Sequence, residues 1–278
     1  MEYSRYCRLL QRMRREAASM GNDSAQDILE KVIKAQGGAE RWQRAAAVEA
    51  IISARGFLFT AKRRPILNRV RVRAFVHEPR FVFYDFPQAG QTAELCGAAE
   101  VKITGADQQI SAVRAEPRSA FRRLRRQLYW DDLDFTYFGG YATWNYLVTP
   151  FLFLMKEVRL TALAPVTGID YPIRLQARFP DDLPTHSKTQ VFYFDSNYLL
   201  RRLDYTAEVV GRWARAAHLC ENFRDFGGIK IPTTRRVLPL LIGSRPLPGP
   251  TLVALYIHDF RLVPTGASEL KAGKVSEF

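Results

Sequence analysis

The spacing of apolar residues predicts a helix at the start of the folded part of the chain. After the N-cap pair Asp23-Ser24, apolar side chains recur at helical spacing until Gly37-Gly38 ends the pattern. A short helical turn through Trp42 then leads into residues 48–60, whose β-branched and aromatic residues predict one long strand, bent or bulged at Gly56. The residues of the helical apolar stripe are Ile28, Leu29, Val32, Ile33 and Ala35.

Much of the remaining chain alternates between apolar and polar residues with a period of two. Residues 69–77 place valines and an alanine on one face and three arginines on the other, which predicts a half-buried strand. Because no strand–helix–strand alternation appears, we expect an antiparallel sheet and an α+β fold. The other segments expected to form strands are 80–86, 94–104, 189–195, 199–210, 217–223, 229–238 and 251–263.

The middle of the chain departs from this alternation. Residues 119–130 place Phe121, Leu124 and Leu128 on one side and arginines on the other, which predicts a basic amphipathic helix. Such a helix suits a membrane surface as well as packing onto a sheet. Residues 131–155 carry eight aromatic side chains around a hinge-like Gly139-Gly140 pair, so this segment either fills a core or lines a cavity.

The chain shows no linker and no repeat. We expect a single domain over residues 23–265, preceded by a basic N-terminal extension over 1–22 and followed by a flexible tail over 266–278. Met20 is a plausible alternative start to Met1, and residues 237–250 form a loop rich in proline and glycine.

Composition and charge narrow the class of protein. Apolar residues make up 47% of the 278 residues, which excludes disordered, collagen-like and disulfide-framework proteins. The net charge is +13, from 41 basic and 28 acidic residues. This excess fits a solvated basic surface, and it also fits anionic partners such as lipid headgroups, an acidic ligand or nucleic acid.

No segment of the sequence has the pattern of a transmembrane helix or a secretory signal. The longest apolar run, 146–155, is about half the length that a membrane helix needs, and it contains Pro150. The widely spaced Cys7, Cys96 and Cys220 form neither a disulfide framework nor a CxxC pattern. We therefore expect a cytoplasmic protein in a reducing compartment.

The usual sequence patterns of metal and cofactor sites do not occur. The histidines are His77, His186, His218 and His258, and no HxH, HxxxH or HxxE spacing links them to other ligands. Phosphate-cradling glycine loops and the GxSxG elbow are also missing, so we expect no metal and no cofactor. Arginines alternate with aromatic residues in 118–130, but without a recognisable module we do not expect nucleic acid to be the partner.

Acid–base chemistry has a small set of candidate residues. His186 and His218 border expected strands, and Asp204-Tyr205 lies between them in sequence. On an antiparallel sheet Asp204 and His218 are candidates for cross-strand neighbours, and a histidine oriented by a carboxylate is a minimal general base. The competing interpretation is that these histidines, like Tyr193 and Tyr205, are structural.

Three local patterns, in this order, resemble the superfamily of the bacterial lipoprotein carrier LolA and its outer-membrane receptor LolB. They are the helix, Gly-Gly and Trp of 25–42, the hairpin of 192–205 and the strand–turn–strand of 223–237. The resemblance implies a strongly curved antiparallel half-barrel wrapped around a helical plug, with an apolar cavity for acyl chains or similar ligands. Unlike those proteins, the chain shows no signal sequence and no lipobox, and it has extra length over 116–184. It therefore looks like a soluble branch of the superfamily. Neither a role in lipoprotein trafficking nor any catalytic residue carries over from the resemblance.

Together these observations favour a binding module for a hydrophobic or amphipathic small molecule. Arginines at the mouth of the cavity would select an anionic headgroup, and the candidates include Arg201, Arg202, Arg235 and Arg236. One alternative is a small-molecule biosynthetic enzyme that uses His186, His218, Asp204 and Tyr205 in the same cavity; another is an interaction protein that presents the basic helix to an acidic partner. The oligomeric state stays open. The expected ligand-binding residues are Phe135, Tyr137, Tyr141, Trp144, Tyr146, Phe151, Phe153, Tyr193, Arg201 and Arg235.

Overall fold

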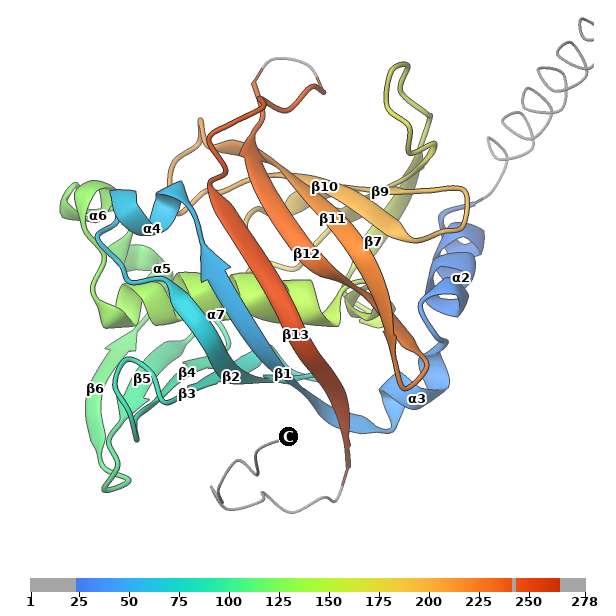
Figure 1. Cartoon of the computed structure of the whole chain (residues 1–278). Helices are drawn as coiled ribbons and strands as arrows, with labels where there is room; N and C mark the ends of the chain where they lie inside the picture. Colours follow the sequence, from blue (N-terminus) through green and yellow to red (C-terminus); the bar gives the residue numbers. More distant parts are fainter. Residues whose placement is uncertain (1–23, 242–243, 266–278) are drawn as a thin grey trace, which may run out of the picture.

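The computed structural model describes residues 24–241 and 244–265, which Figure 1 shows in colour. The N-terminal extension and the C-terminal tail expected from the sequence lie outside these residues. Within the described part, strands contain more residues than helices do, and helices cover or fill one side of them.

The described strands form one 13-stranded sheet in which every neighbouring pair is antiparallel. The strand order is β6-β5-β4-β3-β2-β1-β13-β12-β11-β10-β9-β8-β7, so the first and last described strands pair with each other at the centre of the sheet. The strands are β1 (Ala45–Arg55), β2 (Leu67–Phe75), β3 (Arg80–Tyr84), β4 (Thr92–Cys96), β5 (Glu100–Thr104), β6 (Ile110–Ala115), β7 (Arg159–Leu163), β8 (Ile173–Arg178), β9 (Thr189–Phe194), β10 (Leu200–Thr206), β11 (Arg215–Phe226), β12 (Ile229–Pro239) and β13 (Val253–Pro264).

The first helix is confirmed where the sequence predicts it. Ser24 caps it and forms a capping box with Asp27, because each side chain accepts a hydrogen bond from the other residue's backbone N–H. The described helices are α2 (Ala25–Ala35), α3 (Ala39–Gln43), α4 (Phe57–Ala61), α5 (Pro117–Ala120), α6 (Arg125–Leu128), α7 (Asp132–Val148) and the 3-10 helix η1 (Phe151–Leu154).

Helix α7 fills the interior. It contacts β2 to β6 directly, and its side chains also reach residues of β10, β11 and β12, so strands from both halves of the sheet meet the same helix (Figure 1). Its sequence has no polar face, as a helix surrounded by protein requires. A capping box of Asp131 and Asp134 begins the helix, and both carboxylates are paired with Arg114 and Arg126.

The Gly139-Gly140 pair is not a hinge, because both residues lie inside α7. A Cβ added at Gly140 would stand 3.2 Å from the Cβ of Leu95, and one at Gly139 would stand 3.3 Å from Cζ of Phe83. The pair therefore lets α7 approach β3 and β4 closely.

The expected strand over 48–60 is wrong in its second half. Strand β1 ends at Arg55, and the backbone carbonyl of Leu252 comes so close to Gly56 that a Cβ there would stand 2.5 Å from it. The chain turns at this glycine, which has a φ of 141°, and winds into α4, which buries Phe59. The expected strand over 94–104 is likewise two strands, β4 and β5, joined by a turn at Gly97 with a φ of 61°.

The predicted basic helix over 119–130 is replaced by two four-residue helices, α5 and α6. Phe121 and Trp130 pack edge to face in the interior, with ring centroids 5.5 Å apart. Leu124 and Leu128 instead face solvent, 83% and 71% exposed. The apolar stripe predicted from their spacing is therefore divided between the core and the surface. No helix among the described residues is long and apolar enough to cross a membrane.

Candidate functional site

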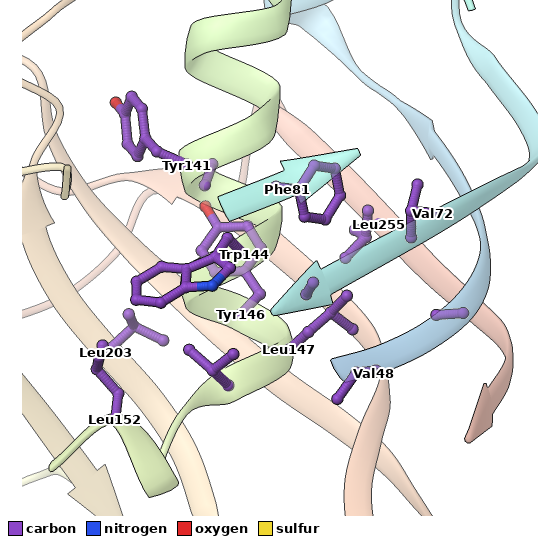
Figure 2. Close-up of a cluster of buried hydrophobic side chains, with 14 of the residues drawn as sticks. Val48, Val72, Phe81, Tyr141, Trp144, Tyr146, Leu147, Leu152, Leu203 and Leu255 are labelled. Atoms are coloured by element: carbon purple, nitrogen blue, oxygen red, sulfur yellow. The ribbon is translucent and has the colours of Figure 1, made fainter. Parts of the chain in front are cut away.

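An apolar cavity lies between α7, α4 and the sheet. Its volume is about 40 Å³, room for about two or three water molecules. Phe135, Phe138 and Tyr146 of α7 line it, together with Leu58 and Phe59 of α4. The dry hollow expected from the sequence is thus largely filled by side chains: Figure 2 shows Trp144, Leu203 and Leu255 among those that occupy the interior.

A buried polar cluster lies on the other side of Tyr146. His186, which follows β8, accepts or donates hydrogen bonds through both ring nitrogens: Nδ1 lies 3.2 Å from the Tyr141 hydroxyl and Nε2 lies 2.8 Å from the Tyr146 hydroxyl. The Tyr146 hydroxyl also lies 3.3 Å from that of Tyr205 on β10. The Tyr205 ring stacks on His186 with 4.0 Å between centroids, so these rings hold one another in fixed orientations.

His218 completes this cluster from β11. It is fully buried, and its ring meets the Tyr146 ring edge to face at a centroid distance of 4.4 Å. Neither of its ring nitrogens has a hydrogen-bond partner among the described residues. An unpartnered buried polar ring costs free energy, so its presence calls for an explanation.

Burial keeps both histidines neutral. It lowers the pKa of His186 to about 3, and the charge of Arg118 acts in the same direction. Burial, followed by the charge of Arg235, holds the pKa of His218 well below its ordinary value. Burial also raises the pKa of the Tyr141, Tyr146 and Tyr205 hydroxyls, so these groups stay protonated. Because neutral His186 has one N–H, it donates to one of its two tyrosine hydroxyls and accepts from the other.

Arg235 on β12 brings a positive charge into the same interior. It is only 2% exposed, and its guanidinium lies over the Tyr146 ring, 5.4 Å from the centroid. It donates to the backbone carbonyl of Tyr146 at 2.6 Å and to Sγ of Cys220 at 3.3 Å. A second cavity of about 10 Å³ adjoins it, lined also by Tyr146, His186 and Gln190.

The expected ligand-binding aromatics divide into two groups. Phe135 and Tyr146 line a cavity, and the others are packed in the core. Trp144 donates its indole N–H to the carbonyl of Phe75, Phe151 stacks on Trp42, and Phe153 packs edge to face on Phe192. Tyr137 and Tyr141 are fully buried.

The expected pairing of Asp204 with His218 is wrong by one residue. His218 lies opposite Leu203, and Asp204 lies opposite Ala217. Because successive side chains of a strand point to opposite faces, this offset separates the carboxylate from the imidazole. Asp204 instead accepts hydrogen bonds from Tyr193 and Arg202. No described carboxylate makes a hydrogen bond or ion pair with either buried histidine, and a catalytic role for these residues stays a prediction.

Three of the arginines expected at a cavity mouth are ion-paired instead. Arg201 binds Asp195 at 2.6 Å, Arg202 binds Asp204 at 2.6 Å, and Arg236 binds Glu221 at 2.6 Å. They line neither cavity described above. Of the four expected arginines, Arg235 is the one that lines one of these cavities, because the strand alternation places it on the same side as Ile231 and Val237.

Several lining residues were not predicted from the sequence. Phe59 and Leu58 were assigned to a strand, and their place at the cavity depends on the turn at Gly56. Gln190 and Asn145 line the smaller cavity, and no local pattern marks either of them. Among the described residues, no group of three or more histidine, cysteine or acidic side chains is placed to hold a metal ion.

Comparison with known proteins identifies the fold. No family model matches the chain, and no curated protein matches its sequence. The crystal structure of a LolA superfamily protein from Nitrosomonas europaea superposes with a TM-score of 0.50 at 16% sequence identity, covering 86% of this chain and 94% of that one. The chain has a LolA-like fold.

A second solved structure matches over a similar length. It is a DUF1329 family protein from Desulfovibrio piger, with a TM-score of 0.46, 14% identity, and coverage of 87% of this chain and 94% of that one. The match to the LolA superfamily protein confirms, at the level of the LolA-like fold, the resemblance expected from residues 25–42, 192–205 and 223–237.

Proposed function

We propose that the protein binds a hydrophobic or amphipathic small molecule between α7 and the sheet. In this proposal the sheet acts as a half-barrel and α7 as its helical plug. The observation that carries the proposal is the apolar cavity between α4, α7 and the sheet, which lies inside a LolA-like fold. The expected cytoplasmic location stays a prediction.

Burial of an alkyl chain supplies the driving force. Each methylene removed from water contributes about 0.8 kcal/mol, well above the roughly 0–1 kcal/mol of an exposed ion pair. The cavity of about 40 Å³ is smaller than the roughly 300–1,000 Å³ of a typical small-molecule site, so binding requires side chains to move.

Helix α4 is the wall best suited to move. It has five residues and begins at Gly56, whose φ of 141° gives the chain a sharp turn. Lys62 and Arg64 hold its C-terminal side through hydrogen bonds to the carbonyls of Arg126 and Trp130. Opening therefore breaks a few polar contacts and exposes Phe59, while α7 and the sheet stay in place.

Native mass spectrometry of the protein purified from cells, with lipid extraction, tests the proposal. We expect a co-purifying hydrophobic ligand and binding of fluorescent fatty-acid probes. Ala142→Phe, which fills the cavity, should abolish probe binding, whereas Ala112→Phe on strand β6 should leave it intact. Absence of any co-purifying ligand together with no probe binding would overturn the proposal.

A second candidate function is favoured by the surface of α6. Leu124 and Leu128 are exposed there, and Arg122, Arg123 and Arg125 beside them are also exposed. We propose that this surface, the α6 face, docks onto an anionic membrane. Its position beside α4, which Lys62 joins to the carbonyl of Arg126, places it next to the apolar cavity.

A further inference from the structure

The buried charge of Arg235 has no counter-ion in the described part of the chain. No described carboxylate pairs with it, although arginines elsewhere in the sheet, such as Arg202, do have one. A guanidinium does not lose its proton in a protein, so the charge persists in the interior. Burying an unpaired ion lowers the stability of the fold, and the rest of the structure has to offset that cost.

One of its hydrogen bonds has a structural explanation. The Tyr146 carbonyl lies in the last turn of α7, and Pro150 lacks the N–H that would otherwise reach it, so Arg235 caps this helix end. That role uses one terminal nitrogen. The other donates only to a weak sulfur acceptor, and Nε has no partner among the described residues.

His218, a neighbour of Arg235, also has hydrogen-bonding groups without a described partner. In the pairing of β11 with β12, Cys220 lies opposite Arg235 and His218 lies opposite Val237, so His218 and Arg235 are diagonal neighbours on one face. The ring nitrogens of His218 are also without described partners. A neutral imidazole offers one donor, and the arginine offers two parallel donors, which together fit an oxyanion.

Tyr146 connects this polar region to the apolar cavity, because its side chain lines both cavities. Its hydroxyl is held by His186 and Tyr205. If the Tyr146 ring moves aside, the two cavities join, and Nε2 of His186 and the Tyr205 hydroxyl become free to bind an incoming group.

We propose that the ligand is a single-chain amphiphile with an oxyanion head, a carboxylate or a phosphate, and that the head binds Arg235 and His218 while the chain occupies the apolar cavity. This inference rests on the proposed function, since it assigns the chemistry of the ligand in the same interior. It also accounts for a buried charge that has no described counter-ion and for a buried imidazole that has no described hydrogen-bond partner.

The experiment compares ligands that share one chain and differ in the head. Binding of dodecanoate, dodecyl phosphate and 1-dodecanol to the purified full-length protein is measured by calorimetry, with acetate and inorganic phosphate as chain-free controls. We expect at least one of the two anions to bind about tenfold or more tightly than the alcohol, as a charge-assisted hydrogen bond predicts. Which anion binds more tightly distinguishes a carboxylate head from a phosphate head.

Two variants test whether Arg235 causes the preference for the anions over the alcohol. Arg235→Gln removes the charge but keeps a donor for the Tyr146 carbonyl, so the anions and the alcohol should then bind alike. Arg202→Gln removes another buried arginine, one that already has its carboxylate, and should leave the preference unchanged. A merely structural role of Arg235 would lower thermal stability without changing the ratio of affinities.

The outcomes separate the two proposals. Equal binding of the anions and the alcohol by the unmodified protein would overturn the oxyanion inference and leave the hydrophobic site standing. Failure of all three chains to bind would overturn both. Tight binding of acetate or phosphate alone would show an anion site that needs no chain, and it would overturn the amphiphile assignment.

Discussion

At the scale of single residues, the buried histidines set the pH dependence of stability. The unfolded chain protonates its histidines near pH 6.5, whereas folded His186 stays neutral down to a pH of about 3. The unfolded state therefore binds more protons as the pH falls below 6.5, and the free energy of unfolding decreases. The pKa of folded His218 is also lowered, so both histidines contribute to this loss of stability at low pH.

His218→Leu tests this argument. Because the ring nitrogens of His218 have no partner among the described residues, we expect the variant to be more stable at pH 7 by about 1–3 kcal/mol. Its loss of stability between pH 6.5 and pH 5 should be about half that of the unmodified protein, whose limit is about 1.4 kcal/mol per pH unit for each histidine. Urea unfolding at a series of pH values measures both quantities.

His186→Leu is the contrasting variant. It removes the partner of the Tyr141 hydroxyl and one partner of the Tyr146 hydroxyl, so it should destabilise the protein at pH 7. A destabilised His218→Leu protein, or an unchanged pH slope, would contradict the interpretation that His218 is kept at a cost in stability.

The residue scale also shows what the sequence could not reveal about the site. Strand alternation is enough to predict that Arg235 points inward with Ile231 and Val237. From the sequence alone, we instead expect this arginine at the mouth of the cavity. The pairing of Asp204 with His218 failed because register was not fixed by the residues between β10 and β11. One residue of offset decides whether two side chains share a face, and local sequence does not determine it.

At the scale of elements, the start of α7 concentrates charge in a small space. Asp131 caps the helix, accepts the backbone N–H of Asp134 and pairs with Arg114 and Arg126. These arginines hold the pKa of the Asp131 carboxyl well below its ordinary value, against the effect of burial. The end of the central helix therefore depends on a cap and on ion pairs at once.

Comparison of two N-caps separates these contributions. Ser24→Ala removes the exposed cap of α2 and should cost about 1 kcal/mol. Asp131→Ala removes an equivalent cap and also leaves two arginines without one carboxylate, so it should cost clearly more, about 2–4 kcal/mol. Chemical unfolding measures both values. Equal losses in the two variants would show that the ion pairs at α7 contribute nothing.

Elements were predictable where one local pattern decided the outcome. The apolar stripe and the capping residues predicted the bounds of α2, and the alternation of apolar and polar residues predicted β2, β9 and β12. The edge strands β6 and β7, which bury few side chains, were missed, and so was β8, although its sequence alternates between apolar and polar residues. Residues 57–61 were misassigned because their aromatics fit a strand, while tertiary contact at Gly56 ends it.

At the scale of the whole molecule, the order of the strands depends on contacts that are distant in sequence. The pairing of β1 with β13 joins the two halves of the sheet and brings together residues from nearly opposite ends of the described chain. No local sequence pattern indicates this pairing. The same long-range packing separates the apolar residues of 119–130. Phe121 reaches α7 through Tyr137, whereas Leu124 and Leu128 are left outside. The exposed leucines are thus a product of the fold.

The α6 face should bind anionic membranes. Three arginines near such a surface contribute about 1 kcal/mol each, and insertion of a leucine side chain contributes roughly 1.5–3 kcal/mol. The nearby Asp131 and Asp134 are already paired with Arg114 and Arg126, so they offset the exposed arginines little. We expect the protein to co-sediment with phosphatidylglycerol vesicles and to do so weakly with phosphatidylcholine vesicles.

Two sets of substitutions test whether this face is responsible. Leu124→Ser with Leu128→Ser, and separately Arg122→Gln with Arg123→Gln and Arg125→Gln, should each reduce vesicle binding about tenfold or more. Leu154→Ser changes a half-exposed leucine in η1, which follows the C-terminal end of α7, and should have no effect. Binding that persists in both sets would place the contact elsewhere, the basic residues 1–22 included. Loss with the arginine set alone would indicate electrostatic adsorption, in which the exposed leucines play no part.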